Sequence, residues 1–314
     1  MANNLQELPR FGDRLSYLYV ERARVDQDQK AIAIHQFDGT THVPVAALAV
    51  LMLGPGTTLT HAAIKCLAEN NCLVLWTGEN AVRFYAQGFG GARHARNIQH
   101  QARLVSNELT RLQVVIRMYC RRFPDPIPGN VTLQQLRGME GIRVRKAYAA
   151  AAEAAGIEWH GRSYDRGNWN YADPVNRALS AGNSCLYGLA SAAILSAGYS
   201  PALGFIHVGK QLSFVYDIAD LYKADYIFPV AFRLAAEKTP EIERAMRLEC
   251  RKLFAQQKII ERIVPDIAKL LEISAEQLDA AGDPYAEDAS QPAPLWDPKT
   301  FSTELPIEQI LAMK

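Results

Sequence analysis

The hydrophobic pattern of this chain changes its period at residues 88–92, Gly-Phe-Gly-Gly-Ala, and this change constrains the fold more than any other feature. Before it, apolar and polar residues alternate, as in Leu15–Glu21 and Lys30–His35, which is typical of half-buried β-strands. After it, apolar residues recur every three or four positions, which is typical of amphipathic helices. The glycines indicate a flexible joint. We therefore predict an α+β protein, with a small β-rich domain at residues 1–88 and a larger all-helical domain at residues 89–280.

The N-terminal part contains signals for several strands and one helix. Residues 37–40, Phe-Asp-Gly-Thr, predict a turn between strands. The continuous apolar run Ala47–Leu53 predicts a buried strand, and residues 60–69 predict a helix that a threonine caps. Cys72–Trp76 and Val82–Ala86 have the composition of two further strands.

Beyond the joint, capping residues and prolines divide the chain into helices. One long helix is predicted over about residues 94–122, ended by the proline-rich segment 124–128. Thr132 and Gln135 form a capping box for the next helix, which Gly156 can end. The predicted apolar face of the first helix consists of Ile98, Ala102, Val105, Leu109, Leu112 and Ile116.

Further helices and a tail are predicted towards the C-terminus. An Asp-Pro pair begins a helix over about residues 173–198, whose alanines and serines suit close packing in the centre of the domain. Ser213 can cap a short helix. A Thr-Pro pair at residues 239–240 begins a long helical stretch that Pro265 interrupts. Residues 281–314 are rich in Pro, Ala and Asp and predict an extended or disordered tail.

The net charge of +1 conceals an uneven distribution of charge along the chain. Residues 83–123 contain eight arginines and one acid, whereas residues 275–314 contain eight acids and two lysines. The basic stretch indicates a polyanionic partner. The acidic end is either a solvated tail or a segment that docks on a basic surface.

Composition indicates a soluble globular protein, with 49% hydrophobic and 21% charged residues. No run of about 18 apolar residues occurs, so we expect no membrane span and no membrane partner. The first ten residues lack an export pattern. The five cysteines form no CxxC pair, and we expect reduced, buried thiols in a cytoplasmic protein.

Four residues combine into a candidate metal centre: Glu140, His207, Asp217 and Asp220. A carboxylate from each of two distant segments, together with an imidazole, can hold a divalent metal and leave coordination positions open. Such a metal can activate an oxygen nucleophile and stabilise a phosphoryl transition state. Asp217 and Asp220 share a face of a predicted helix whose apolar neighbours indicate burial, so they need a cation or a basic partner.

Each of these residues also has a purely structural interpretation. The two aspartates could lie on a solvated helix face, or pair with Lys210 or Lys223. His207 could be a hydrogen-bonded core histidine, and Glu140 could pair with Arg143 one turn along its helix. The set is specific only if the segments that carry it converge in the fold.

Three segments around these residues resemble the signature segments of a known family. They are Leu136–Arg143, Gly204–His207 and Ser213–Asp220. The family is the metal-dependent integrase that inserts new spacers into CRISPR arrays, the universal first CRISPR-associated protein. The resemblance covers residues 10–275. It is closest to the subtype that works with the multi-subunit Cascade complex, to which residues 162–165 and 184–188 are also similar.

The resemblance implies a catalytic role for all four residues. Glu140, His207 and Asp220 would ligate Mg²⁺ or Mn²⁺, and Asp217 would support the metal or the nucleophile. The implied reaction is transesterification, in which the 3′-hydroxyl of a short DNA fragment attacks a phosphodiester at the edge of a CRISPR repeat. With water in place of that hydroxyl, the same site is an endonuclease. No ATP is implied, because one phosphodiester is exchanged for another.

The resemblance also implies a set of DNA contacts. The two tyrosines in this set could stack on an unpaired base or bind a phosphate, or they could pack in the core. The lysine could hold a phosphate or be a solvated loop residue, and the arginines on the C-terminal helix could be solvated. The implied DNA-binding residues are Arg83, Tyr164, Tyr187, Lys210, Arg247 and Arg251.

The partners implied by the resemblance are double-stranded DNA, a second copy of the chain, and a small second CRISPR-associated protein that bridges two dimers. The DNA would be both the incoming fragment and the CRISPR repeat, and the N-terminal domain would contribute dimer and DNA contacts. Three positions depart from the subtype. Thr40 and Thr58 stand where arginine is frequent, and Arg22 stands where a tyrosine wedge is often used against the duplex end. These departures affect the implied binding of DNA and leave the four catalytic residues unchanged.

Two other functions fit the same residues. A structure-specific nuclease for branched repair intermediates would share every site residue, and only its substrate would differ. A non-catalytic DNA-binding scaffold would use the acids to stabilise helices, and a metal titration would distinguish it.

Overall fold

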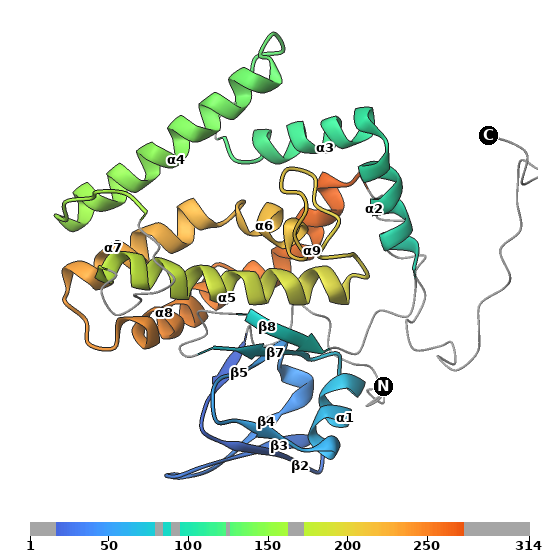
Figure 1. Cartoon of the computed structure of the whole chain (residues 1–314), viewed down its shortest axis with the longest axis vertical. Coiled ribbons are helices and arrows are strands. Elements are labelled where there is room, and N and C mark those ends of the chain that lie inside the picture. Colours follow the sequence, from blue (N-terminus) through green and yellow to red (C-terminus); the bar gives the residue numbers. More distant parts are fainter. Residues whose placement is uncertain (1–16, 79–83, 89–94, 124–125, 163–172, 273–314) are drawn as a thin grey trace, which may run out of the picture.

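The structure of the protein is a computed structural model in which a β-rich part with one helix adjoins a helical part (Figure 1). The described residues are 17–78, 84–88, 95–123, 126–162 and 173–272. The last strand ends at Gly88 and the next helix begins at Arg96. The predicted α+β class is confirmed, whereas the predicted tail at residues 281–314 lies outside the described residues.

Two four-stranded sheets form the N-terminal part. The first has the order β1-β5-β7-β8, in which β1, β5 and β7 are parallel and β8 is antiparallel to β7. Its strands are β1 (Leu18–Val20), β5 (Val50–Leu53), β7 (Leu73–Thr77) and β8 (Phe84–Gly88). The second has the order β4-β3-β2-β6. Its strands are β2 (Arg24–Asp28), β3 (Ala31–Gln36), β4 (Gly39–Pro44) and β6 (Thr58–Leu59).

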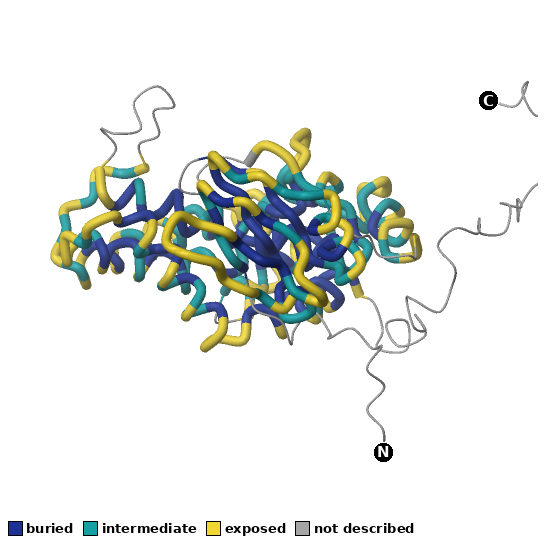
Figure 2. Tube along the Cα trace, turned by 90° about the horizontal axis from the view of Figure 1, so that it is seen from below, coloured by how far each residue is buried: buried dark blue, intermediate teal, exposed yellow. Residues whose placement is uncertain are grey.

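Strand β5 is an inner strand of the first sheet and is buried on both of its faces, which explains its continuous apolar sequence. Val50 and Met52 pack with the helical part, whereas Leu51 and Leu53 pack with the second sheet and with helix α1 (His61–Glu69). Figure 2 shows the buried residues gathered in the middle of the molecule. The protein therefore has two hydrophobic cores, and the first sheet contributes side chains to both.

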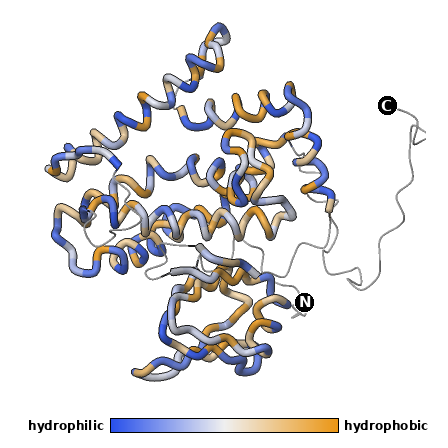
Figure 3. Tube along the Cα trace, viewed as in Figure 1, coloured by the Kyte–Doolittle hydropathy of each residue, from blue (hydrophilic) through white to orange (hydrophobic). Residues whose placement is uncertain are grey.

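The helical part surrounds one central helix, α5, which contacts α6, α7, α8 and α9. The helices are α2 (Arg96–Ser106), α3 (Glu108–Cys120), α4 (Leu133–Ala155), α5 (Pro174–Ser196), α6 (Ser213–Ala219), α7 (Phe228–Ala236), α8 (Ile242–Gln256) and α9 (Ile259–Leu270), with the π-helical turn η5 at Lys223–Ile227. Figure 3 shows hydrophobic residues concentrated in the strands and central helices, and hydrophilic residues prominent along α2.

Helix α5 is apolar because it lies in the core of the protein. Among the described residues it is the one helix long and apolar enough to cross a membrane, but 83% of its most apolar window is buried within the protein. Its small residues permit close approach, since a Cβ at Gly188 would collide with Met52 of β5. The predicted central position of this segment is confirmed.

The predicted helix caps are confirmed where they depend on local sequence. The Thr60 side chain accepts a hydrogen bond from the N–H of Ala63. Thr132 and Gln135 form the predicted capping box of α4, and Gly156 ends that helix in the left-handed conformation with φ 64°. Asp173 caps α5.

The single helix predicted over residues 94–122 is wrong, because Asn107 divides it into α2 and α3. Asn107 is extended and its side chain caps α3 by accepting from the N–H of Thr110. The break rotates the second half, so Leu109 of the predicted apolar face is 65% exposed, whereas Val114 and Met118 are buried. A capping side chain inside an apolar period is sufficient to produce this error.

The predicted interruption at Pro265 is also wrong. The chain breaks earlier, at Gln257 and Lys258, and Lys258 has a positive φ of 51°. Pro265 lies within α9 on its exposed side. Water can reach the carbonyl that the proline leaves without its helical hydrogen bond, so the helix continues through it.

Candidate functional site

Asp217 organises the turn that precedes its own helix. The residue is fully buried on α6, and its Oδ2 accepts hydrogen bonds from the backbone N–H groups of Phe205 at 2.6 Å and Ile206 at 3.1 Å. Its Oδ1 accepts from the N–H of His207 at 2.9 Å and lies 2.7 Å from the His207 Nδ1. The carboxylate therefore has donors on both oxygens and needs no lysine, so the alternative of pairing with Lys210 or Lys223 does not hold for Asp217.

His207 is held by Asp217 with its second ring nitrogen available. Because Nδ1 is bound to Asp217, Nε2 is left for another partner, and it lies 3.9 Å from Oδ2 of Asp220. The hydrogen bond to Asp217 raises the pKa of the imidazole, although partial burial acts in the opposite direction. A carboxylate that orients the imidazole in this way is a common support for a metal-ligating histidine.

Asp220 follows α6 and pairs with a lysine one turn further on. Lys223 Nζ lies 2.6 Å from Asp220 Oδ1, which confirms Lys223 as the predicted partner. Burial lowers the pKa of Lys223, but the charge of Asp220, its hydrogen bond and the interactions with Tyr187 together outweigh burial, and the pKa is raised. The same Nζ lies 4.6 Å from the centre of the Tyr187 ring, and Tyr187 also contacts Tyr216 edge-on. Tyr187 therefore lies beside the candidate site.

Ser213 does not cap α6 as predicted. The preceding Leu212 occupies the cap position, where no side chain binds the helix. Instead, the Ser213 Oγ accepts from the N–H of Lys210 at 3.1 Å and donates to the carbonyl of Lys210 at 2.8 Å. The serine thus fixes the loop between His207 and the helix, and Lys210 itself is exposed on that loop.

The turn that carries His207 requires glycine at position 204. A Cβ on Gly204 would collide with the backbone carbonyl of His207 and with Ser213. We expect Gly204→Ala to lower the free energy of unfolding by about 1–3 kcal/mol or more, measured by urea denaturation. Gly138→Ala, at an exposed position of α4, meets nothing within 4 Å and is the control, with an expected gain of about 0.5–1 kcal/mol. If both variants lost the same free energy of unfolding, the collision of a Cβ at position 204 would not be the cause.

Glu140 lies on α4 and is bound by two arginines. Arg143 donates through Nε and Nη2 at 2.8 and 3.0 Å, and Arg122 donates through Nη1 at 3.0 Å. Burial raises the pKa of the Glu140 carboxyl, but the hydrogen bonds and charges of Arg143 and Arg122 together outweigh burial, and the pKa is lowered. The pairing with Arg143 is the structural alternative named above, whereas Arg122 was not predicted.

The side-chain atoms that could ligate a divalent cation are only partly arranged to do so. The His207 Nε2 and Asp220 Oδ2 face each other, and imidazole with carboxylate suits Mn²⁺ or Mg²⁺. Within the described ranges, no group of three or more His, Cys, Asp or Glu side chains is placed to hold a metal ion. Glu140 is the predicted third ligand that does not join the other two, because its carboxylate is occupied by arginines.

The predicted DNA-binding residues are dispersed in the structure. Arg83 and Tyr164 lie outside the described residues. Arg247 is only 7% exposed and stacks on the Tyr19 ring at 4.5 Å, so it is not the solvated surface arginine that was the alternative. It lines a cavity of about 410 Å³ between β1 and α8 together with Arg251.

Sequence reasoning missed Arg244, which lines the same cavity. It stands three residues before Arg247 and seven before Arg251, a spacing that places all three on one helix face and could have identified it. Glu21 and Glu241 also line this cavity, so its charge is mixed.

The three atypical positions all lie in the β-rich part. Arg22 has a positive φ of 50°, and its N–H donates to the Pro55 carbonyl. Thr40 Oγ1 lies 2.9 Å from His35 Nδ1 across the β3–β4 hairpin, and Thr58 is exposed on β6. Thr40 and Thr58 therefore lie in the second sheet, whereas Arg22 lies in the connection between β1 and β2.

The sequence is similar to CRISPR-associated proteins over most of its length. Residues 119–249 match the family described as CRISPR associated protein Cas1. The chain is 54% identical to CRISPR-associated endonuclease Cas1 2 of Thermus thermophilus, over 94% of the chain and 90% of that protein. It is 40% identical to CRISPR-associated endonuclease Cas1 of Escherichia coli K12, over 94% of the chain and 93% of that protein.

The fold is similar to solved structures of the same kind. A crystal structure described as a TtCas1–DNA complex has 51% sequence identity and a TM-score of 0.78, and covers 90% of this chain and 97% of that one. A CAS1 protein from Thermotoga maritima has a TM-score of 0.67 at 14% identity, covering 82% of this chain and 96% of that one. The second likeness concerns the fold alone.

Proposed function

This chain belongs to the Cas1 family of CRISPR-associated endonucleases, and we propose that it is a metal-dependent DNA integrase that inserts short DNA fragments into a CRISPR array. The observation that carries the proposal is the arrangement of His207 with its Nδ1 on buried Asp217 and its Nε2 facing Asp220. A relative at 51% identity was crystallised with DNA, which supports DNA as the substrate class.

Each residue of the site has a distinct task in this proposal. A bound Mg²⁺ or Mn²⁺ supplies positive charge that lowers the pKa of an attacking hydroxyl and offsets charge on the phosphate. His207 and Asp220 hold the cation, with Glu140 as the third ligand once its arginines release it. Asp217 is a positioning residue, because it fixes the imidazole and reaches no substrate. Lys223 keeps Asp220 oriented through its 2.6 Å contact.

The same site cuts or joins DNA according to the nucleophile. A fragment 3′-hydroxyl gives strand transfer, and water gives endonuclease cleavage. Tyr187 beside Lys223 is suited to contact an unpaired base or a phosphate, and the arginines along α8 are suited to the DNA backbone. Arg83, Tyr164 and Lys210 are proposed as further DNA contacts from the resemblance alone.

The proposed assembly follows the same resemblance. We propose a cytoplasmic homodimer that joins a second dimer through a small second CRISPR-associated protein. The buried cysteines 66, 72, 185 and 250 suit a reducing compartment, because none forms a disulfide.

One assay tests the proposed function. The purified protein, with and without the small partner, is mixed with a labelled fragment, Mn²⁺ and a supercoiled plasmid that carries a CRISPR repeat. We expect the label to enter the plasmid at the repeat edge, and to be lost when EDTA removes the metal.

The control substrate is a mobile branched junction without a repeat. Preferred cleavage of the junction over integration would favour the structure-specific repair nuclease instead. Binding without any metal-dependent reaction on either substrate would favour the scaffold.

A further inference from the structure

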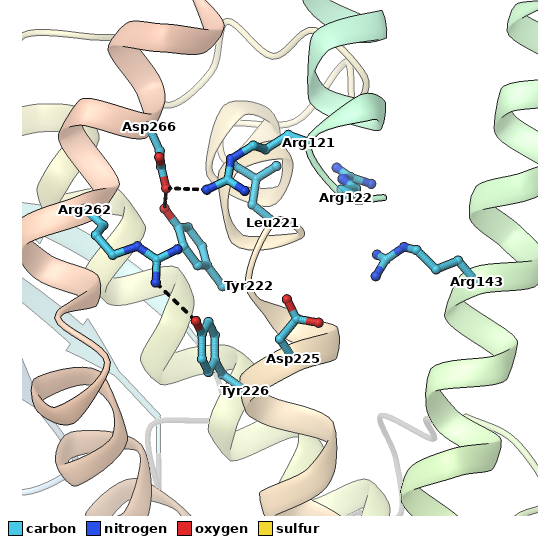
Figure 4. A pocket seen from close by; sticks show the side chains of 9 residues that line it. All are labelled: Arg121, Arg122, Arg143, Leu221, Tyr222, Asp225, Tyr226, Arg262 and Asp266. Atoms are coloured by element: carbon cyan, nitrogen blue, oxygen red, sulfur yellow. Dashed lines mark hydrogen bonds and ion pairs between the residues drawn. The ribbon is translucent and has the colours of Figure 1, made fainter. Parts of the chain in front are cut away.

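A small polar cavity lies beside the candidate site, between the end of α3, α4, the segment after α6, and α9. Its volume is about 50 Å³, which is room for a few water-sized groups. Figure 4 shows guanidinium groups around it that come from the end of α3, from α4 and from α9. The lining arginines are Arg121, Arg122, Arg143 and Arg262.

The carboxylates around the cavity do not balance these four positive charges. Asp225 and Asp266 are the acids in its lining. Asp266 lies 3.5 Å from Arg121 and accepts a hydrogen bond from the hydroxyl of Tyr222 at 2.7 Å. Counting Glu140, which binds two of the arginines, three negative charges face four positive ones. The cavity therefore has an excess of positive charge.

Arg122 has one edge of its guanidinium group buried without a partner. Its side chain is 4% exposed, and its Nη1 is the atom that binds Glu140. Its Nε and Nη2 are buried and have no hydrogen-bond partner among the residues that the structure describes. Buried charged donors without acceptors are unfavourable, so an acceptor placed there is stabilised.

The vacant atoms form the edge that arginine uses for bidentate binding of oxyanions. Arg177 uses the same two atoms to bind Glu243, with Nε at 2.7 Å and Nη2 at 2.8 Å from its oxygens. Arg143 uses them to bind Glu140. Arg122 therefore presents the same recognition element with nothing bound to it.

We propose that this cavity binds a single phosphate group, with two of its oxygens on the Nε–Nη2 edge of Arg122. A phosphate dianion offsets the excess positive charge, and Arg143 and Arg262 face it from neighbouring walls. The cavity has no room for a nucleoside, so only the phosphate group itself enters. Its source is either the end of a DNA strand or free phosphate.

The bound phosphate also affects Glu140, and this part of the inference rests on the proposed function. Arg122 and Arg143 bind Glu140 and line the cavity, so a cation ligated by Glu140 is repelled by both guanidinium groups. A phosphate in the cavity offsets that repulsion and draws the arginines away from the carboxylate. By linkage, the anion and the divalent cation each strengthen binding of the other by the same factor.

The first test measures inorganic phosphate binding by isothermal titration calorimetry in the absence of metal. Arg122→Lys keeps a positive charge for Glu140 but loses the bidentate edge, and we expect its phosphate affinity to fall about tenfold. Arg177→Lys loses the same edge outside the cavity and should bind phosphate as the wild type does. Arg262→Gln removes another arginine that lines the cavity, should weaken binding several-fold, and covers the case in which Arg122→Lys is unfolded. No phosphate binding by the wild type, or unchanged affinity in both cavity variants, would overturn the site.

The second test identifies the source and separates this inference from the proposed function. If DNA supplies the phosphate, a duplex with 5′-phosphates competes with inorganic phosphate, and one with 5′-hydroxyls competes less. No competition by either duplex identifies free phosphate.

Mn²⁺ affinity is then measured in sulfate and in chloride at equal ionic strength. Sulfate takes the place of phosphate in this experiment, since sulfate does not precipitate manganese. We expect Mn²⁺ binding to the wild type to be about fivefold tighter in sulfate than in chloride, and Mn²⁺ binding to Arg122→Lys to be the same in both salts. Phosphate binding without any Mn²⁺ binding would retain the anion site and reject the metal centre.

Discussion

Replacing His207 or Asp220 with alanine is expected to reduce strand transfer by about a hundredfold to a thousandfold. The His207 Nε2 and the Asp220 Oδ2 lie 3.9 Å apart and face each other. Loss of either side chain therefore removes one of the two atoms proposed to ligate the cation. Affinity for duplex DNA is expected to stay within about twofold, because it depends mainly on cationic side chains that both variants retain. Gel analysis of a labelled fragment with Mn²⁺ measures the first quantity, and fluorescence anisotropy measures the second.

Glu237→Ala is the matched control for this pair of variants. Glu237 is an acid of the same helical part, 52% exposed and paired with Arg233, and its removal should leave strand transfer unchanged. Circular dichroism confirms that each variant is folded. If His207→Ala and Asp220→Ala both integrate normally, the assignment of the catalytic set is wrong.

The parts of this fold that could be predicted from the sequence are those set by local chemistry. A threonine with a glutamine three residues later produced a capping box, and an aspartate before a proline began the central helix, as predicted. The period-2 run of β3 became a paired strand for the same reason. In each case the contacts that decide the structure lie within a few residues of the signal.

The parts that could not be predicted depend on contacts between distant residues. Arg122 binds Glu140 across 18 positions, and no local pattern indicates that pairing. The sequence indicated that Asp217 is buried, but not that a backbone turn would supply its donors in place of a lysine. The candidate ligands could therefore be named, whereas the partners that control them required the fold.

Asp217→Asn is expected to weaken Mn²⁺ binding by about tenfold to a hundredfold, although Asp217 does not itself hold the cation in the proposed site. Both Asp217 oxygens face donors: Oδ2 meets the N–H groups of Phe205 and Ile206, and Oδ1 meets the N–H and Nδ1 of His207. An asparagine must place its NH₂ at one of these positions. At Oδ2 it opposes two backbone N–H groups, so the position beside His207 is preferred.

In that orientation the amide donates to Nδ1, and the imidazole must carry its proton on Nε2. A protonated Nε2 cannot ligate a metal, so affinity falls even in a folded protein. We also expect the free energy of unfolding to fall by about 1–3 kcal/mol, because one backbone donor still lacks an acceptor. Calorimetry with Mn²⁺ and urea denaturation measure the two effects, and ¹⁵N NMR of the imidazole reports the tautomer.

Glu243→Gln separates loss of the tautomer from loss of stability. Glu243 is a buried carboxylate on α8 that Arg177 binds through two nitrogens, so the variant should also be destabilised. Because Glu243 does not contact His207, its Mn²⁺ affinity should remain that of the wild type. Were Asp217→Asn to keep full Mn²⁺ affinity with the proton on Nδ1, Asp217 would serve the fold alone. The cation would then have to depend on groups other than the nitrogen that Asp217 orients.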